Sequence, residues 1–465
     1  MNLKQYIWTT GLLVTLLLAA CTTADTLDER TAEELRASVS TEQYINLHIV
    51  NGTAATTRAT SNEERAIYDG IICLFEGATE GTATLKTAVS IDQLVNNPGS
   101  SAEVNITQRL AVGSHPYQDG QKRYVLVLLN TTSTGFRLSG TDLYHNNTCL
   151  TGQILATLQD VVIDDVGSTA EHVGLYMSNA PQADGSVMPE ATALYDTEAA
   201  AHASGASRVD IHVERAAAKV TVKNETASLT NIHINGVSTA YPKVHRLTWT
   251  VNNYHTHCYA LRHAPSPYAN WATSCGTDDL LSYSATDFGF YPIQLHGNDD
   301  VYLAENTTAT PTEIIVELQL KDASNMLIHE AFLFHPFGEH TNLYTSAESY
   351  IYYLQTGFPL DNMAAYHLQN RSREDVFKHA TLIIQDNGSV KLTLVNSDFN
   401  ATEQQGLSDL ADFLSSVTTG FRDGKMYYTY TIKHDTDHTY GVVRNNAYTL
   451  TINDAAIQGI GRHQP

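Results

Sequence analysis

Short runs of alternating apolar and polar residues recur along this chain, and such runs are typical of β-strands. The first lies at residues 44–50, where Ile45, Leu47 and Ile49 are separated by Asn46 and His48. Because successive side chains of a strand point to opposite faces, the three apolar side chains share one face. We therefore expect a half-buried strand that directs Ile45, Leu47 and Ile49 into a core.

Similar runs follow at short intervals, separated by turn-forming residues. Examples are "AIYDGIICLFEG", "KRYVLVLLN", "RVDIHVERAAAKVTVKN", "EIIVELQL", "SVKLTLV" and, near the end of the chain, "KMYYTYTIKH". This spacing favours a sandwich or barrel over alternating strand–helix units. One helix is predicted over residues 400–417, where Asn400 can cap the first turn and Leu407, Leu410 and Leu414 fall at helical spacing.

The chain of 465 residues is too long for one ordinary core, so we expect two domains. The small and polar stretch "YDTEAAAHASGAS", residues 195–207, is typical of a boundary between them. We predict an all-β fold in which two tandem β-sandwich domains, residues 59–207 and 208–465, carry only a few short helices. Residues 22–40 are polar and acidic, which predicts a solvated tether ahead of the first strand.

The first 21 residues form a separate segment. Lys4 precedes an apolar stretch at residues 7–20, and Cys21 follows it. Fourteen residues are too few for a bilayer span, which needs about 20, so residues 1–21 predict an export signal. "LAAC", residues 18–21, resembles the bacterial lipobox, whose cysteine is lipidated and becomes the mature N-terminus. An ordinary signal peptide with a chance cysteine is the alternative. The lipobox predicts an outer-membrane lipoprotein anchored through Cys21.

Charge and composition narrow the class of partner. The chain has 27 basic and 50 acidic side chains and a formal net charge of -23, which argues against a nucleic-acid partner. Charged residues make up only 17% of the chain, while 25 tyrosines contribute to a composition suited to pleated sheet with polar turns.

Two histidine clusters are the candidates for metal chemistry. In "LIHEAFLFHPFGEH", His329 and Glu330 begin a pattern like H-E-x-x-H, but the next histidine is His335, six residues after the first instead of four. On a helix the two histidines do not share a face, and Pro336 would break that helix. A secreted hydrolase built on residues 329–340 is therefore only an alternative.

The second cluster contains His255, His257 and Cys258, followed by His263 and Cys275. Its spacing matches no structural zinc class, although a strand would place His255 and His257 on one face. The sequence also lacks a nucleophile elbow, a phosphate loop and a dinucleotide fingerprint. We therefore predict a protein that is not an enzyme and that binds no cofactor or metal.

Several of these segments together resemble the fimbrillins, the subunits of type V pili, and most closely the minor fimbrium subunit branch. They are the lipobox, the early strand, the lone arginine in "TTRAT", "VERAAAKV" at 213–220, and "MYYTYTIKH" and "YGVVRNNAYTLTINDAAIQGIG" within 426–461. "VVRNNAYTLTI", residues 442–452, is the most specific segment. The resemblance implies transthyretin-like sandwich domains, a cell-surface fimbrium that supports adhesion, and other fimbrial subunits as partners.

The resemblance also implies proteolytic maturation by an arginine-specific protease. The cut would fall between Arg58 and Ala59, in a Thr-, Ala- and Gly-rich stretch that suits a protease. Arg36 and Arg65 are rival positions. Residues 22–58 would then be a propeptide that carries the removable strand with Ile45, Leu47 and Ile49. Its departure would leave a groove that a neighbouring subunit fills by adding a strand, and repeated head-to-tail contacts would build a filament.

In one alternative, the final strands, residues 427–432 and 442–452, swing out as the donor that a neighbour accepts. Many fimbrillins continue past this point into a further pair of strands, whereas only "RHQP" follows Gly461 here. The candidate donor residues are Val442, Val443, Tyr448, Leu450 and Ile452. Two alternatives remain: a tip or accessory adhesin that accepts a strand without donating one, and a surface lipoprotein that binds glycan or host protein without polymerising.

Overall fold

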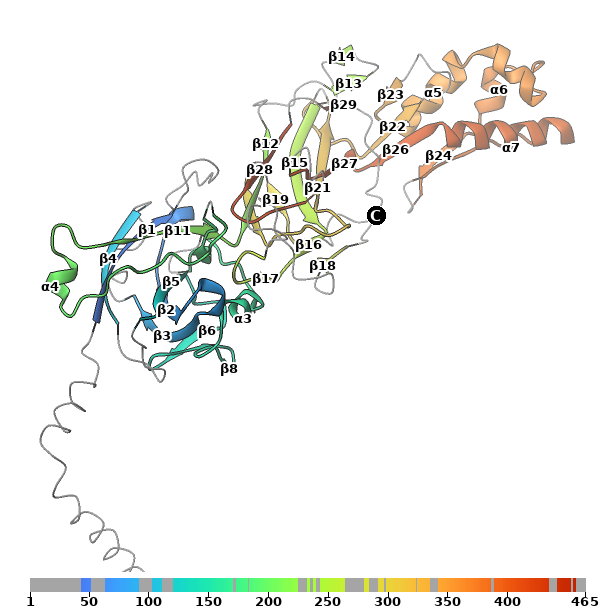
Figure 1. The fold of residues 1–465 in the computed structure, drawn as a ribbon. Helices are drawn as coiled ribbons and strands as arrows, with labels where there is room; N and C mark the ends of the chain where they lie inside the picture. The colour runs from blue at the N-terminus through green and yellow to red at the C-terminus, as the bar shows by residue number, and fades with distance from the viewer. Residues whose placement is uncertain are drawn as a thin grey trace, which may run out of the picture.

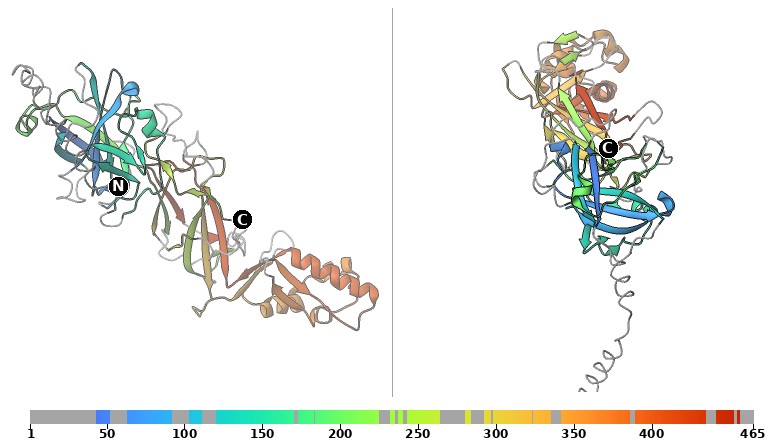
Figure 2. Two further views of the ribbon diagram at one scale, coloured as in Figure 1. Left: turned by 90° about the horizontal axis from the view of Figure 1, so that it is seen from below. Right: turned by 60° about the vertical axis from the view of Figure 1, so that its left-hand side comes forward.

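The computed structural model shows an elongated molecule (Figure 1). The seven-stranded sheet that contains β1 (Gln43–Asn51) lies at one end, and the helices α5 (Ala347–Gly357), α6 (Arg373–Phe377) and α7 (Ala401–Ser416) lie at the other. The view from below in Figure 2 shows the same linear order. The structure describes residues 43–51, 63–91, 103–110, 120–169, 173–182, 184–224, 232–234, 237–239, 243–263, 280–283, 292–296, 298–322, 324–334, 342–385, 389–434, 441–452 and 455–456.

The N-terminal domain is built on a sheet with the strand order β3-β2-β5-β10-β11-β1-β4. One apolar cluster contains side chains from most of these strands, among them Ile45, Leu74, Ile106 and Val127. The edge strands β3 and β4 approach each other, so the sheet curls around this cluster. The other strands of the sheet are β2 (Gly70–Gly77), β3 (Thr84–Ser90), β4 (Glu103–Leu110), β5 (Lys122–Leu129), β10 (Met177–Asn179) and β11 (Val209–Arg215).

Shorter elements cover the outer face of this sheet, where Cys73, Phe75 and Leu126 pack in a second apolar cluster. Full burial raises the pKa of the Cys73 thiol, which is free and uncharged in this core. The short elements are η1 (Glu63–Arg65), η2 (Glu80–Thr82), β6 (Phe136–Ser139), β7 (Asp142–His145), β8 (Thr148–Cys149), α3 (Leu155–Gln159), β9 (Val162–Ile163) and α4 (Glu198–Ala201).

The chain passes into a second β-rich domain at Ala216 and Ala217. These two residues connect β11 of the N-terminal sheet to β12 (Ala218–Asn224), which belongs to another sheet. Two sheets, with the orders β20-β12-β28 and β19-β15-β21-β27, contribute to one core around Trp249. Their strands are β15 (Lys243–Asn252), β19 (Leu295–His296), β20 (Asp300–Leu303), β21 (Glu313–Lys321), β27 (Lys425–Thr431) and β28 (Ala447–Ile452). Smaller pieces are β13 (Ile232–Ile234), β14 (Val237–Thr239), β16 (Tyr254–His255), β17 (Cys258–Tyr259), β18 (Leu280–Leu281) and β29 (Ala455–Ala456).

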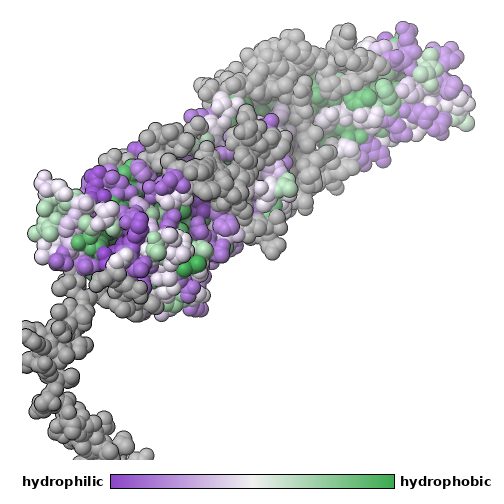
Figure 3. Space-filling view, viewed as in Figure 1, coloured by the Kyte–Doolittle hydropathy of each residue, from purple (hydrophilic) through white to green (hydrophobic). Residues whose placement is uncertain are grey.

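A helical module with its own apolar core extends from the second domain between β22 (Glu330–Phe334) and β26 (Thr418–Arg422). Tyr350, Phe358 and Phe377 are fully buried in that core. The remaining pieces are β23 (Asn342–Tyr344), η5 (Leu360–Tyr366), β24 (Thr381–Ile384) and β25 (Val390–Thr393). In Figure 3 the visible surface is largely hydrophilic over the N-terminal sheet, and green patches appear toward this module. The predicted fold class, all-β with few short helices, is confirmed.

The predicted helix is confirmed as α7. Asn400 is its N-cap, and the Asn400 side chain accepts hydrogen bonds from the backbone N–H groups of Thr402 and Glu403. We expect Asn400→Ala to lower the unfolding free energy of the module by about 1 kcal/mol, because these two donors lose their partner. Chemical denaturation followed by circular dichroism measures this change. Ser408→Ala, on the exposed face of the same helix, is the control, and an equal loss in both variants would contradict the prediction.

Candidate functional site

The first strand of the described chain lies inside the N-terminal sheet. β1 pairs in parallel with β11, with Leu47 opposite Val209, and antiparallel with β4, with Leu47 opposite Ile106. The side chains of Ile45, Leu47 and Ile49 are 0% exposed. Both the strand and the burial of these three side chains are therefore as the alternating sequence pattern predicts. A strand in this position closes the sheet between β11 and β4, so its removal would open a slot there.

The opposite face of β1 carries polar contacts to β11. His48 Nδ1 lies 2.8 Å from Asp210 Oδ1, and Arg208 donates to the same carboxylate at 2.9 Å. At the start of the strand, Tyr44 and Tyr195 exchange two backbone hydrogen bonds of 2.7 and 2.9 Å. These contacts and the two ladders hold β1 in place from both sides.

The end of β1 contacts the segment that leads into β2. Asn51 is almost fully buried, and its side-chain amide donates to the carbonyl oxygen of Arg65 at 3.0 Å. Arg58 and Ala59, the predicted cleavage position, lie outside the described residues, as does the predicted lipidation site Cys21. Cleavage and lipidation therefore remain predictions.

The predicted donor residues divide into two groups, of which the first is fixed in the protein interior. Val442 and Val443 are fully buried, and the backbone of Val442 forms two hydrogen bonds with that of Asn306, of 2.7 and 2.8 Å. The second group lies on β28, which pairs in parallel with β12 at the edge of its sheet. There Tyr448, Leu450 and Ile452 are only half-buried.

Arg444 follows the first group and is fully buried. Its guanidinium donates to both carboxylate oxygens of Glu305, at 3.0 and 2.8 Å, and to the carbonyl oxygen of Tyr259 at 2.6 Å. Desolvation opposes the charge on Arg444, but Glu305 outweighs it and raises the pKa of the guanidinium. Tyr259 belongs to β17, which pairs with β9 of the N-terminal domain. Arg444 therefore connects the segment 442–446 to the joint between the two domains.

β1 and β28 each lie beside one of two consecutive strands of the chain. β1 runs parallel to β11, and β28 runs parallel to β12, the strand that follows directly. Asn445 lies at the junction, where its N–H donates to Ala217 O at 2.9 Å. Its φ of +60° lies in the left-handed region that asparagine tolerates better than most residues. Both strands thus have the same orientation relative to their partners.

Further buried ion pairs connect the two domains. Arg262 donates to Glu214 at 3.0 and 2.6 Å, and Lys219 Nζ lies 2.7 Å from Glu64 Oε1. Within the second domain, Lys219 Nζ also lies 2.7 Å from Oδ2 of the exposed Asp300. Sequence analysis did not predict these pairs. The only local signal for these ion pairs was the resemblance itself. "VERAAAKV" contains Glu214 and Lys219, and "VVRNN" contains Arg444.

The described members of the two histidine clusters form no metal site. Among the described residues, no three His, Cys, Asp or Glu side chains are grouped to hold a metal ion. His255 is buried, whereas His257 is partly exposed and lies 3.4 Å from Asp164. His335 and Cys275 lie outside the described residues.

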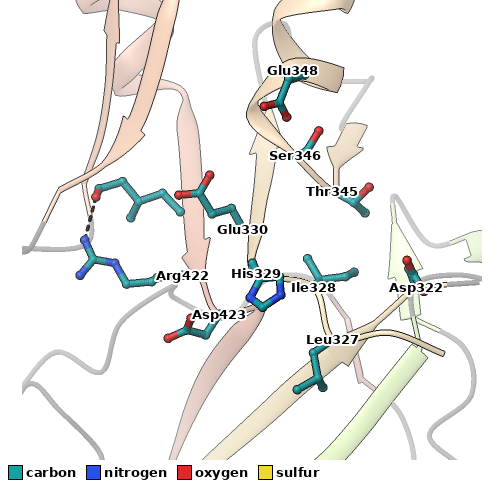
Figure 4. Close-up of a pocket in the computed structure, with 11 residues that line it drawn as sticks. Asp322, Leu327, Ile328, His329, Glu330, Thr345, Ser346, Glu348, Arg422 and Asp423 are labelled. Carbon is teal, nitrogen blue, oxygen red and sulfur yellow. Dashed lines mark hydrogen bonds between the residues drawn. The ribbon is translucent and has the colours of Figure 1, made fainter. Parts of the chain in front are cut away.

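His329 and Glu330 line a polar cavity of about 660 Å³, shown in Figure 4. Glu330 begins strand β22 rather than a helix. The cavity lies where the turn after β21, the start of α5 and the end of β26 meet.

Part of the chain is similar in sequence to bacterial fimbrial proteins, and some solved structures are distantly similar to it. Residues 419–465 match the family described as "Major fimbrial subunit protein type IV, Fimbrillin, C-terminal". No protein of curated function matches the sequence. A fimbrial assembly protein from Parabacteroides distasonis is 12% identical with a TM-score of 0.33, over 66% of this chain and 87% of that one. The C-terminally truncated tip fimbrial protein Mfa3 from Porphyromonas gingivalis is 12% identical with a TM-score of 0.29, over 61% and 80%.

The fold thus defines a β-rich protein in which β1 and β28 pair in parallel with the consecutive strands β11 and β12. Over residues 419–465 the chain is of the fimbrillin type, so the resemblance predicted from the sequence is confirmed for this C-terminal segment. Its place in the minor fimbrium branch remains a prediction, and TM-scores this low transfer no function. No helix in the described part of the chain has the length and apolar character of a membrane span.

Proposed function

We propose that this protein is a structural subunit of a type V fimbrium and supports adhesion. In this proposal it is exported to the outer membrane as a lipoprotein through Cys21, is cut after Arg58 by an arginine-specific protease, and is assembled by strand exchange. The observation that carries the proposal is the position of β1, which is bonded to a strand on each side and directs three fully buried side chains into the core.

The loss of β1 creates the driving force for assembly. Burying each of Ile45, Leu47 and Ile49 contributes roughly 1.5–3 kcal/mol, and the strands β11 and β4 lose a ladder of hydrogen bonds when β1 leaves. A strand from another subunit that supplies alternating apolar side chains restores both contributions. The uncut precursor is kept monomeric because its own strand fills the slot.

The structure favours β28 over the preceding segment as the detachable donor. Release of Arg444 would break its two hydrogen bonds to the buried carboxylate of Glu305, so residues 442–446 act as an anchor. Tyr448, Leu450 and Ile452 alternate as Ile45, Leu47 and Ile49 do, and they lie on a half-buried edge strand. β28 also pairs in parallel with its partner, as β1 does with β11.

A tip or accessory adhesin is the second candidate. The helical module favours it, because the module lies at the opposite end of the molecule from β1 and exposes the large apolar side chains of Tyr352 and Ile383. Such a subunit accepts a strand through the β1 slot and presents the module to its ligand.

Cleavage by an arginine-specific protease tests the proposed function. We expect the purified chain to lose residues up to 58 and to form a ladder of multimers on native gels, because the open slot accepts β28 of another copy. Arg58→Ala is the control, and it should stay monomeric. If the propeptide leaves and the cut chain stays monomeric at every concentration, self-polymerisation is excluded. Equal ligand binding by the uncut Arg58→Ala chain would favour a non-polymerising binding protein.

A further inference from the structure

The segment between β1 and β2 contains a second arginine whose peptide bond is held on both sides. Arg65 ends the short helix η1, and its carbonyl oxygen accepts the hydrogen bond from Asn51. The next residue, Ala66, donates its N–H to Glu63 O at 3.3 Å and accepts a hydrogen bond from the Asn130 side chain at 2.9 Å. The Arg65–Ala66 bond is therefore fixed in a turn and is not extended.

Glu64 fastens this turn to the second domain. It is only 3% exposed, and its Oε1 accepts hydrogen bonds from Lys219 Nζ at 2.7 Å and from the Tyr302 hydroxyl at 3.1 Å. Lys219 lies on β12 and Tyr302 on β20, so both partners lie downstream of the turn. A carboxylate is costly to bury unless it is paired, and pulling the turn out would break the ion pair between Glu64 and Lys219.

We propose that Glu64 determines where the propeptide is removed, by keeping the Arg65–Ala66 bond out of reach of an arginine-specific protease. A protease acts on chain that opens locally from the fold, and the rate of cutting follows the population of the open form. Opening at Arg65 breaks both bonds of Glu64 as well as the bond from Asn51. Glu64 thus acts as a positioning residue, and this role rests on the proposed maturation of the chain.

The two restraints on Arg65 differ in what happens after maturation. Asn51 belongs to β1 and leaves with it, so the Arg65 carbonyl loses that donor. The bonds of Glu64 are made to β12 and β20 and remain in the processed subunit. Glu64 is therefore the restraint that keeps residues 59–65 on the mature protein. A cut after Arg65 would remove Glu64 together with residues 59–65. Lys219 and Tyr302 would then lose their bonds to this carboxylate.

The test maps the new N-terminus by mass spectrometry after the full chain is exposed to an arginine-specific protease. We expect the natural chain to give a product that begins at Ala59 and that persists. Glu64→Ala should form the Ala66 product at least about ten-fold faster, because the opened turn no longer breaks an ion pair. Lys219→Met, which removes the ammonium from the other side, should give the same shift. Asp300→Asn is the matched control, because it changes the same network and leaves Glu64 bonded to Lys219 and Tyr302.

A second background separates this inference from the proposed function. In chains that carry Arg58→Ala, we expect the Asn51→Ala and Glu64→Ala double variant to be cut at Arg65, while the parent Arg58→Ala chain resists. This comparison stands even if the natural chain is never cut at Arg58. Equal rates of cutting after Arg65 in all variants would overturn the role of Glu64. So would a lowered melting temperature in Glu64→Ala without any Ala66 product, because Glu64 would then stabilise the joint without directing the protease.

Discussion

Glu305→Ala is expected to destabilise the protein by about 3–5 kcal/mol, because it leaves the fully buried guanidinium of Arg444 without its carboxylate. Chemical denaturation measures the loss. The same variant should loosen the domain joint, since Arg444 also bonds the carbonyl of Tyr259 in the strand that pairs with the N-terminal domain. Hydrogen exchange should therefore rise at residues 258–263 and 442–446.

Two control variants test whether the stability loss in Glu305→Ala comes from the unpaired charge of buried Arg444. Lys122→Ala removes an ion pair with Glu190 that is largely exposed, so its loss of stability should be much smaller than that of Glu305→Ala. The double variant Glu305→Leu with Arg444→Met should recover most of the lost stability, because it removes both charges and keeps apolar volume. A Glu305→Ala loss no larger than that of Lys122→Ala would contradict the role of Arg444 as an anchor.

Leu47→Asp is expected to expel β1 from the sheet and to make the uncut precursor behave as if it had been processed. Leu47 is 0% exposed, and a carboxylate in its place would be buried without a partner while the apolar contribution of leucine is lost. We expect multimers on size-exclusion chromatography without protease. In a separate sample, a protease of broad specificity should cut rapidly within residues 43–51.

Asn46→Asp is the matched control for Leu47→Asp. It introduces the same charge one position away on the same strand, where the side chain points to the opposite, half-buried face. This variant should stay monomeric and should keep the stability of the natural chain within about 1 kcal/mol. If Leu47→Asp is also monomeric and equally stable, β1 is not the plug of the slot.

Much of the local structure follows from the sequence because its signals are local. The alternation at residues 44–50 predicts β1 and its buried face, and Asn400 with the spaced leucines predicts α7. The helix α5 was not predicted. Its "YIYYLQ" segment is rich in residues with high β propensity, yet Tyr350 and Leu354 pack into the helical core and Ser346 caps the first turn. Tertiary packing therefore overrides propensity there.

The sequence by itself determines that the chain is β-rich, that its first strand has one apolar face, and that its last segment is of fimbrillin type. Only the tertiary structure decides that β1 lies between β11 and β4, that Glu64 bonds Lys219, and that Arg444 bonds Glu305. The partners in these ion pairs are separated by more than a hundred residues, and no local period or spacing encodes such a contact. A strand pattern specifies which face is buried, whereas the choice of neighbour depends on how the whole sheet closes.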